Sequence, residues 1–221
     1  MRTAYAFALS FVAALVSQSA FACATCGCTL SSDAAMGYSA TAGWNVNLMY
    51  SYINQDQLRR GSSSVAPAQV VNDPTTGELE HDTINRQLTV GVTYSPTADW
   101  HLNLQIPYLI RSHSSYTDTT SAPFDESQLD PANLSSSRSS SLGDVKFIAS
   151  YQGLLPTRNF GLQLGVKLPT GNYGGPDASG SGTVGRNPVY FSGGPSAGEL
   201  LDTSLQPGTG STDLIVGAYY Y

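Results

Sequence analysis

The sequence feature that most restricts the fold is a series of six segments in which apolar and polar residues alternate. In the first segment, Trp44, Val46 and Leu48 alternate with Asn45 and Asn47. The six segments span residues 44–52, 87–94, 100–110, 145–152, 160–168 and 214–220. Alternation with a period of two predicts β-strands that have one apolar and one polar face. The segments are close to the ~9–11 residues with which a tilted strand crosses a bilayer, whereas ordinary strands average about 5–6 residues.

The connections between these segments alternate in length. Two are short, Tyr94 to Trp100 and Tyr151 to Phe160, and three are long, about 54–83, 112–143 and 170–212. Aromatic residues gather toward the segment ends, at Trp44, Tyr52, Tyr94, Trp100, Tyr108, Tyr151 and Phe160. Outer-membrane barrels have short periplasmic turns, long extracellular loops and aromatic girdles, whereas a secreted β-sandwich gives no reason for the alternation. We therefore predict an all-β fold, an antiparallel transmembrane β-barrel, placed in the bacterial outer membrane.

The composition excludes two other classes of protein. Charged residues make up 12% of the 221 residues, about half the usual share. Past the N-terminus no apolar run approaches the ~20 residues of a transmembrane helix, which excludes a helical multi-span protein. Ten basic residues against 16 acidic ones provide no basic footprint for nucleic acid. The expected partners are outer-membrane lipid and a small-molecule solute.

The N-terminus is typical of a secretory signal peptide. Met1-Arg2 gives a positive start, residues 4–16 are apolar, and Ala20-Phe21-Ala22 is a small-x-small cleavage site. Loss of Arg2 on cleavage after Ala22 would change the formal net charge from −6 to −7. We expect a signal peptide at 1–22, a cysteine-containing tail at 23–42 and the barrel at 43–221.

All three cysteines, Cys23, Cys26 and Cys28, fall in the predicted tail. Three thiols cannot all pair within one chain, so a disulfide framework is excluded. One disulfide beside a free or acylated Cys23 is one interpretation, and a thiophilic metal site for Cu(I) or zinc is the other. No other cofactor is expected.

Nothing in the sequence predicts an enzyme. The spaced glycines of 180–185 lack the flanking strand and helix of a dinucleotide site. The three histidines, His81, His101 and His113, are dispersed along the chain, and no Ser-His-Asp set follows from their spacing.

Four stretches together resemble a known family: 104–108 (LQIPY), 141–145 (SLGDV), 164–173 (LGVKLPTGNY) and 205–214 (LQPGTGSTDL). They are similar to the outer-membrane transporter-like proteins grouped with the meta-pathway of phenol degradation. The resemblance implies an outer-membrane β-barrel that passes small, often aromatic or hydrophobic, solutes. It also implies further strands, because single-chain bacterial barrels have at least eight. We expect either an incomplete barrel, cut before the final hairpins, or two unrecognised strands near 36–42 and 188–193.

The strand registers also predict which charges line the barrel interior. Arg111, Lys146 and Lys167 fall on the polar, inward side, and Arg86 falls on the outward side. No Asp or Glu falls mid-strand, and the acidic residues gather in the connections. A cationic wall would attract anionic solutes. Alternatively, an inward-folded acidic loop would pair with these cations and fill the interior.

The leading hypothesis is a channel for passive passage of small solutes. The alternative is a structural or binding barrel whose loops or cysteines bind a partner or metal.

Overall fold

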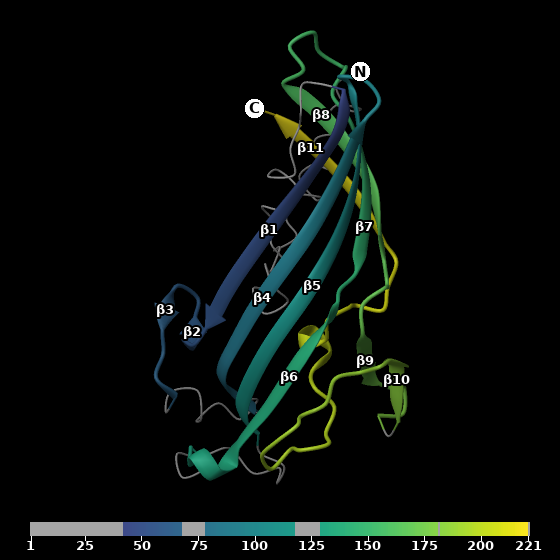
Figure 1. Ribbon diagram of the computed structural model, residues 1–221. Coiled ribbons are helices and arrows are strands. Elements are labelled where there is room, and N and C mark those ends of the chain that lie inside the picture. The colour runs from purple at the N-terminus through teal and green to yellow at the C-terminus, as the bar shows by residue number, and fades with distance from the viewer. Residues whose placement is uncertain (1–41, 68–77, 118–128, 181, 221) are drawn as a thin grey trace, which may run out of the picture.

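The computed structural model describes residues 42–67, 78–117, 129–180 and 182–220, and its main feature is one seven-stranded antiparallel sheet (Figure 1). The strand order is β1-β4-β5-β7-β8-β11. Strand β6 pairs with the C-terminal half of β5. The strands are β1 (Gly43–Gln55), β4 (Glu78–Ser95), β5 (Trp100–Thr117), β6 (Leu134–Leu142), β7 (Val145–Tyr151), β8 (Phe160–Leu168) and β11 (Asp213–Tyr220). The prediction of an all-β chain is confirmed, and the six alternating segments lie in β1, β4, β5, β7, β8 and β11. The sheet is open, because β1 and β11 lie at its two edges.

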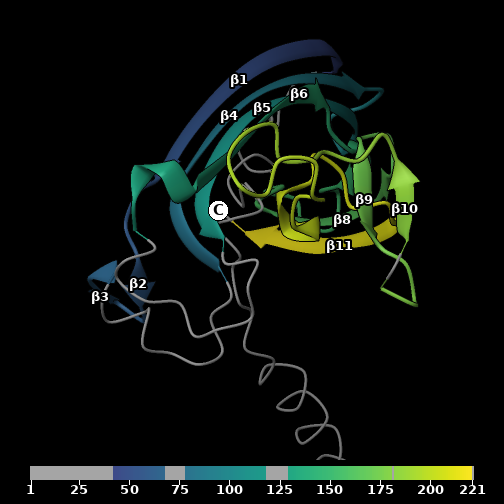
Figure 2. The ribbon, with the colours of Figure 1, turned by 90° about the horizontal axis from the view of Figure 1, so that it is seen from below.

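Smaller elements lie beyond one end of the sheet. They are two ribbons, β2 (Arg59–Arg60) with β3 (Ser63–Ser64) and β9 (Tyr173–Pro176) with β10 (Thr183–Arg186), and the 3-10 helix η3 (Pro131–Asn133). A second 3-10 helix, η4 (Thr203–Leu205), lies within the curve of the sheet (Figure 2). The short connections β4–β5 and β7–β8 lie at the opposite end (Figure 1). In the described chain no helix is long and apolar enough to cross a membrane.

The sheet is curved (Figure 2), and its two faces are inverted relative to those of a water-soluble sheet. The outer, convex face exposes apolar side chains: Trp44, Val46, Leu48, Tyr50, Tyr52, Leu88, Tyr94, Trp100, Leu104, Tyr108, Ile110, Phe147, Leu162, Leu164, Leu168, Leu214, Val216 and Tyr220. The inner face buries polar ones: Thr83, Asn85, Thr89, Thr93, Ser95, His101, Asn103, Gln105, Arg111, His113, Ser115, Ser150 and Lys167. A strand places successive side chains on opposite faces, so the alternation in the sequence produces this inversion directly.

The predicted connection boundaries are wrong in two places. Strands β4 and β5 are each 18 residues long, and β6 occupies 134–142, so much of 112–143 is strand and β4 begins at Glu78 rather than after Thr83. The reason is that these extensions lack a sustained alternation of apolar and polar residues. The LSSSRSSSL sequence of β6 has no apolar period to detect, and its pairing with β5 holds it in strand form.

The strand suspected near 188–193 is not supported. Residues 188–193 contribute the isolated bridges Tyr190↔Leu200 and Ser136↔Gly193, because this segment turns inward instead of joining the sheet. Residues 36–41, like the predicted signal peptide and the three cysteines, lie outside the described residues.

A bulge separates β6 from β7. Tyr108 pairs with Leu142 and Gln105 pairs with Lys146, so the three residues 143–145 face two residues of β5. At Gly143 a Cβ would meet Leu109 Cδ1 at 2.4 Å, which explains why glycine stands at this position. A bulge bends its strand and redirects side chains, and this one carries Asp144 to the inner face of the sheet.

Candidate functional site

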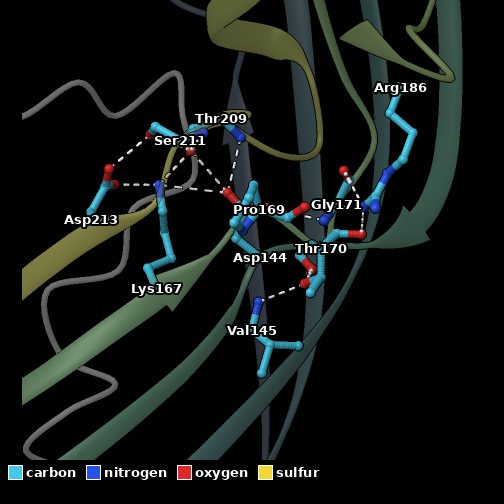
Figure 3. Close-up of polar contacts among 11 residues, drawn as sticks. Asp144, Val145, Lys167, Pro169, Thr170, Gly171, Arg186, Thr209, Ser211 and Asp213 are labelled. Carbon is cyan, nitrogen blue, oxygen red and sulfur yellow. Dashed lines mark hydrogen bonds and ion pairs between the residues drawn. The ribbon is translucent and has the colours of Figure 1, made fainter.

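The inner face holds the residues that the sequence singled out, and Lys167 is the best connected of them (Figure 3). Lys167 is 9% exposed, and its Nζ lies 3.5 Å from Asp144 Oδ2 and in contact with Asp213 Oδ2. The same ammonium donates a hydrogen bond to Thr209 Oγ1. Both anionic partners come from distant parts of the chain, one from the bulge and one from the first residue of β11. The positive charge of Lys167 is therefore neutralised within the fold.

Asp144 organises the chain segments around this lysine. Its side chain is 7% exposed, and Oδ1 accepts a hydrogen bond from the Gly171 amide at 3.0 Å. Its Oδ2 accepts from the Thr209 amide at 2.9 Å and from Thr209 Oγ1 at 3.0 Å. One buried carboxylate thus joins the β7 start, the β8 end and the approach to β11. These are the motifs at 141–145, 164–173 and 205–214, which the structure brings to one place.

The segment after β8 is held by a second cation. The Arg186 guanidinium donates to the carbonyl oxygens of Pro169, Thr170 and Gly171. Thr170 Oγ1 donates to the Gly143 carbonyl and accepts from the Val145 amide, both at 2.9 Å. The Leu-Pro-Thr-Gly strand ending is therefore hydrogen-bonded to the bulge, and these bonds satisfy backbone polar groups of both segments.

Arg111 and Lys146 also lie toward the inner side but in different surroundings. Arg111 is 2% exposed, and its Nε donates a hydrogen bond to Asn85 Oδ1. Asn85 is the residue opposite Arg111 on β4. Lys146 is half-buried and lies opposite both Gln105 and Lys167 in the sheet register. In the described part of the chain no ion pair involves Lys146.

The expectation that the acidic residues gather in the connections is wrong in part, because some of them lie near the starts of strands. Glu80 and Asp82 lie in β4, and Asp213 begins β11. The predicted cationic wall is therefore reduced, because Asp213 and Asp144 neutralise Lys167. The sequence missed this because an ion pair between distant segments leaves no periodic signal.

Residues 187–209, here called the inner segment, lie within the curve of the sheet (Figure 2). The segment has its own small core of Phe191, Leu201 and Leu205, with Val189 packed against it. It is attached to β6, since the Ser192 amide donates to the Ser136 carbonyl at 2.8 Å and the Ser196 amide to Ser135 Oγ at 3.1 Å. The Gln206 side chain fastens the segment internally: its Nε2 donates to the Val189 and Leu201 carbonyls.

Arg86 lies on the apolar face, as its register predicted. Its guanidinium carbon stands 5.9 Å from the centre of the Tyr52 ring, and the two residues are partners in the β1–β4 register. This is a cation–π arrangement, which shields the charge among apolar neighbours.

The structure brings together two of the histidines that are dispersed in the sequence. Antiparallel pairing of β4 with β5 places His81 near Ser114, with His81 Nδ1 at 3.2 Å from Ser114 Oγ and at 3.3 Å from Asp82 Oδ1. Close by, His113 Nδ1 lies 2.7 Å from Thr83 Oγ1. A catalytic triad needs the serine and the carboxylate on opposite ring nitrogens, whereas here both lie at Nδ1 of His81. These contacts form two local hydrogen-bond networks, one around His81 and one around His113, and the contacts of His81 are not those of a catalytic triad.

No group of metal-ligating side chains occurs within the described ranges, and the three cysteines lie outside those ranges. Comparisons of the chain with protein-family models, with curated proteins and with solved structures found no match. The sheet and its inner face therefore carry the functional inference by themselves.

Proposed function

We propose that this chain is an outer-membrane β-barrel protein through which small solutes pass passively, along a polar interior. The observation that carries the proposal is the inverted sheet, with its apolar side chains bare and its polar side chains buried. Soluble monomers rarely expose an apolar patch of more than a few hundred Å², whereas a barrel in lipid requires an apolar exterior. An apolar band that extends over the sheet from β1 to β11 fits hydrocarbon as its solvent.

Aromatic pairs at one end of the sheet support the same proposal. The ring centres of Trp44 and Tyr94 lie 4.6 Å apart, and those of Trp100 and Tyr151 lie 4.8 Å apart. All four residues lie near the short connections. Tryptophan and tyrosine concentrate at membrane–water interfaces, so this end corresponds to the interface on the periplasmic side. The opposite end, with its longer connections, is then extracellular.

The inner face indicates the kind of solute. It is lined by hydroxyl and amide side chains, and Lys146 is its cation without a carboxylate partner among the described residues. Such a wall favours small polar or anionic solutes, such as aromatic carboxylates, because a cation in a narrow passage concentrates anions.

A second candidate function, a barrel with a filled interior, is favoured by the inner segment. This segment lies in the concavity of the sheet and is hydrogen-bonded to β6 and to Asp144. A barrel of this kind would present its loops to a partner instead of passing solutes.

Reconstitution in liposomes tests both candidates. We would measure uptake of benzoate by vesicles that contain the full-length protein, and repeat it with a variant in which residues 189–206 are replaced by a short Gly-Ser linker. Uptake through the unaltered protein supports passage. Uptake through the trimmed variant alone supports the filled barrel. Protein that stays soluble and does not associate with the vesicles would overturn the membrane proposal altogether.

A further inference from the structure

A cleft lies at the end of β1, where the chain turns toward β2 and runs beside the start of β4. It consists of two adjoining cavities of about 480 Å³ and about 310 Å³. Both cavities are lined by Asp56, Gln57, Leu58, Glu80 and His81, so the same side chains separate them or border both. Cavities of about 300–1,000 Å³ are of the size that holds small ligands.

The lining of the cleft has one apolar and one polar part. The smaller cavity is bordered by Leu58, Val65, Pro67, Leu79 and Tyr116. Leu79 is fully buried, and Leu58 and Tyr116 pack against it. These side chains provide a surface that suits a small ring or a short aliphatic body. The larger cavity is bordered by amides and charged groups, so the complementary ligand is amphipathic.

The charges of the cleft favour a cationic ligand. Its described lining includes two carboxylates, Asp56 and Glu80, and one guanidinium, that of Arg59. Arg59 Nη2 already donates to Gln57 Oε1 at 3.1 Å. Asp56 Oδ2 accepts a hydrogen bond from Asn54 Nδ2 at 3.0 Å, which orients the carboxylate and leaves its negative charge in place. The excess of negative charge selects an ammonium over a carboxylate.

A β-bulge places His81 at this cleft. The β4–β5 register shifts between Glu80 and Asp82, so His81 is the extra residue and its side chain is turned out of the regular alternation. Its imidazole is oriented by Nδ1 contacts to Asp82 and Ser114 and stands edge-on to the Tyr116 ring, with centres 5.8 Å apart. In the described part of the chain these hydrogen-bond contacts all use Nδ1, so Nε2 is the nitrogen that a ligand can reach.

We propose that this cleft binds a small amphipathic amine, with its ammonium between Asp56 and Glu80 and its apolar body against Leu58, Leu79 and Tyr116. His81 Nε2 adds a hydrogen-bonding group at the boundary between the two parts. This binding site is separate from the Lys146 wall, and its expected ligand has the opposite charge. Binding at the cleft does not depend on whether solutes pass through the barrel.

The experiment compares three probes that share one body: 2-phenylethylamine, 2-phenylethanol and phenylacetate. Binding to the full-length protein in a non-ionic detergent is followed by saturation-transfer difference NMR. We expect the amine to bind at least about tenfold more tightly than phenylacetate, with the alcohol between them. Equal binding of the three probes would show only hydrophobic partition and would overturn the proposal.

Variants locate the binding site. Asp56→Asn/Glu80→Gln should weaken amine binding about tenfold and leave binding of the alcohol unchanged. Glu199→Gln, an exposed carboxylate of the inner segment that does not line the cleft, is the matched control and should bind the amine as the unaltered protein does. Because Glu80 also accepts a hydrogen bond from Thr83, the single variant Asp56→Asn, at an exposed residue, serves as a second test and should weaken binding severalfold. Unchanged affinity in both variants, or an equal loss in Glu199→Gln, would overturn the proposal.

Discussion

Lys146 of β7 and Lys167 of β8 are direct partners in the sheet register, yet only Lys167 has carboxylate partners within the described chain. Two ammonium groups placed side by side repel each other. Asp144 and Asp213 reduce this repulsion because they neutralise the charge of Lys167. The two lysines therefore have different roles, which single substitutions separate.

Replacing Lys167 should destabilise the protein, whereas replacing Lys146 should not. Lys167→Met leaves the buried Asp144 without its cation, a change that costs about 3 kcal/mol for a buried pair. Lys146→Met removes a half-buried charge and should alter the free energy of unfolding by less than about 0.5 kcal/mol. Urea unfolding in detergent micelles measures both, and equal losses for the two variants would contradict the assignment of roles.

Lys146 should also control ion selectivity if solutes pass along the inner face. In a planar-bilayer recording at about 0.1 M salt, where charges act over ~10 Å, Lys146→Gln should reduce the preference for anions over cations. The control is Arg158→Gln, which removes a cation of the β7–β8 connection that is paired with Asp99. This variant should leave selectivity unaltered. An anion preference that is the same in Lys146→Gln as in the unaltered protein would favour the filled barrel over the channel.

The outer face offers a test of its solvent. Leu164 in β8 and Leu154 in the β7–β8 connection are both exposed, by 58% and 49%. In lipid, Leu164→Arg should cost about 2–4 kcal/mol, and Leu154→Arg, outside the strands, should cost almost nothing. Folding yields into lipid vesicles at a series of urea concentrations measure this difference. If both substitutions are tolerated equally, the outer face is in contact with water.

Two glycines test how the inner segment is fixed. Gly194 and Gly198 both have positive φ, +86° and +90°, so alanine is strained at each by about 1 kcal/mol. A Cβ at Gly194 would in addition meet the Leu134 carbonyl oxygen at 2.3 Å, whereas nothing lies within 4 Å at Gly198. Gly194→Ala should therefore detach the segment from β6 and increase proteolysis within 187–209. Gly198→Ala should be cleaved nearly as slowly as the unaltered protein, and the reverse order would disprove this contact.

The strands and their faces were accessible from the sequence wherever one face is apolar. Leu162, Leu164 and Leu168 repeat at every second or fourth position of β8, and this period alone places them on the outer face. The same reasoning fails in β6, where serines occupy both faces and only pairing with β5 defines the strand. It also stops short in β4, where only Leu79 and Ile84 are apolar among residues 78–86.

The contacts of the candidate sites were not accessible for a different reason. The partners of Lys167 come from a bulge and from a strand far along the chain, and neither position stands out locally. His81 became interpretable only after the β4–β5 register placed Ser114 beside it and the bulge turned its side chain. Sequence periodicity reports which face a side chain occupies, and it does not report which distant side chain it meets there.

This sheet has its polar side covered and its apolar side bare. In plain water it therefore lacks the burial of apolar surface that drives most chains to fold. Hydrogen bonds such as that between Asn103 and Thr93 exchange one set of polar partners for another and gain little. If the outer face lies in lipid, as proposed, an amphiphile acts as a ligand of the native state. Its resistance to urea should appear at the detergent concentration where micelles form, and dilution below that point should unfold the protein without any change in its covalent structure.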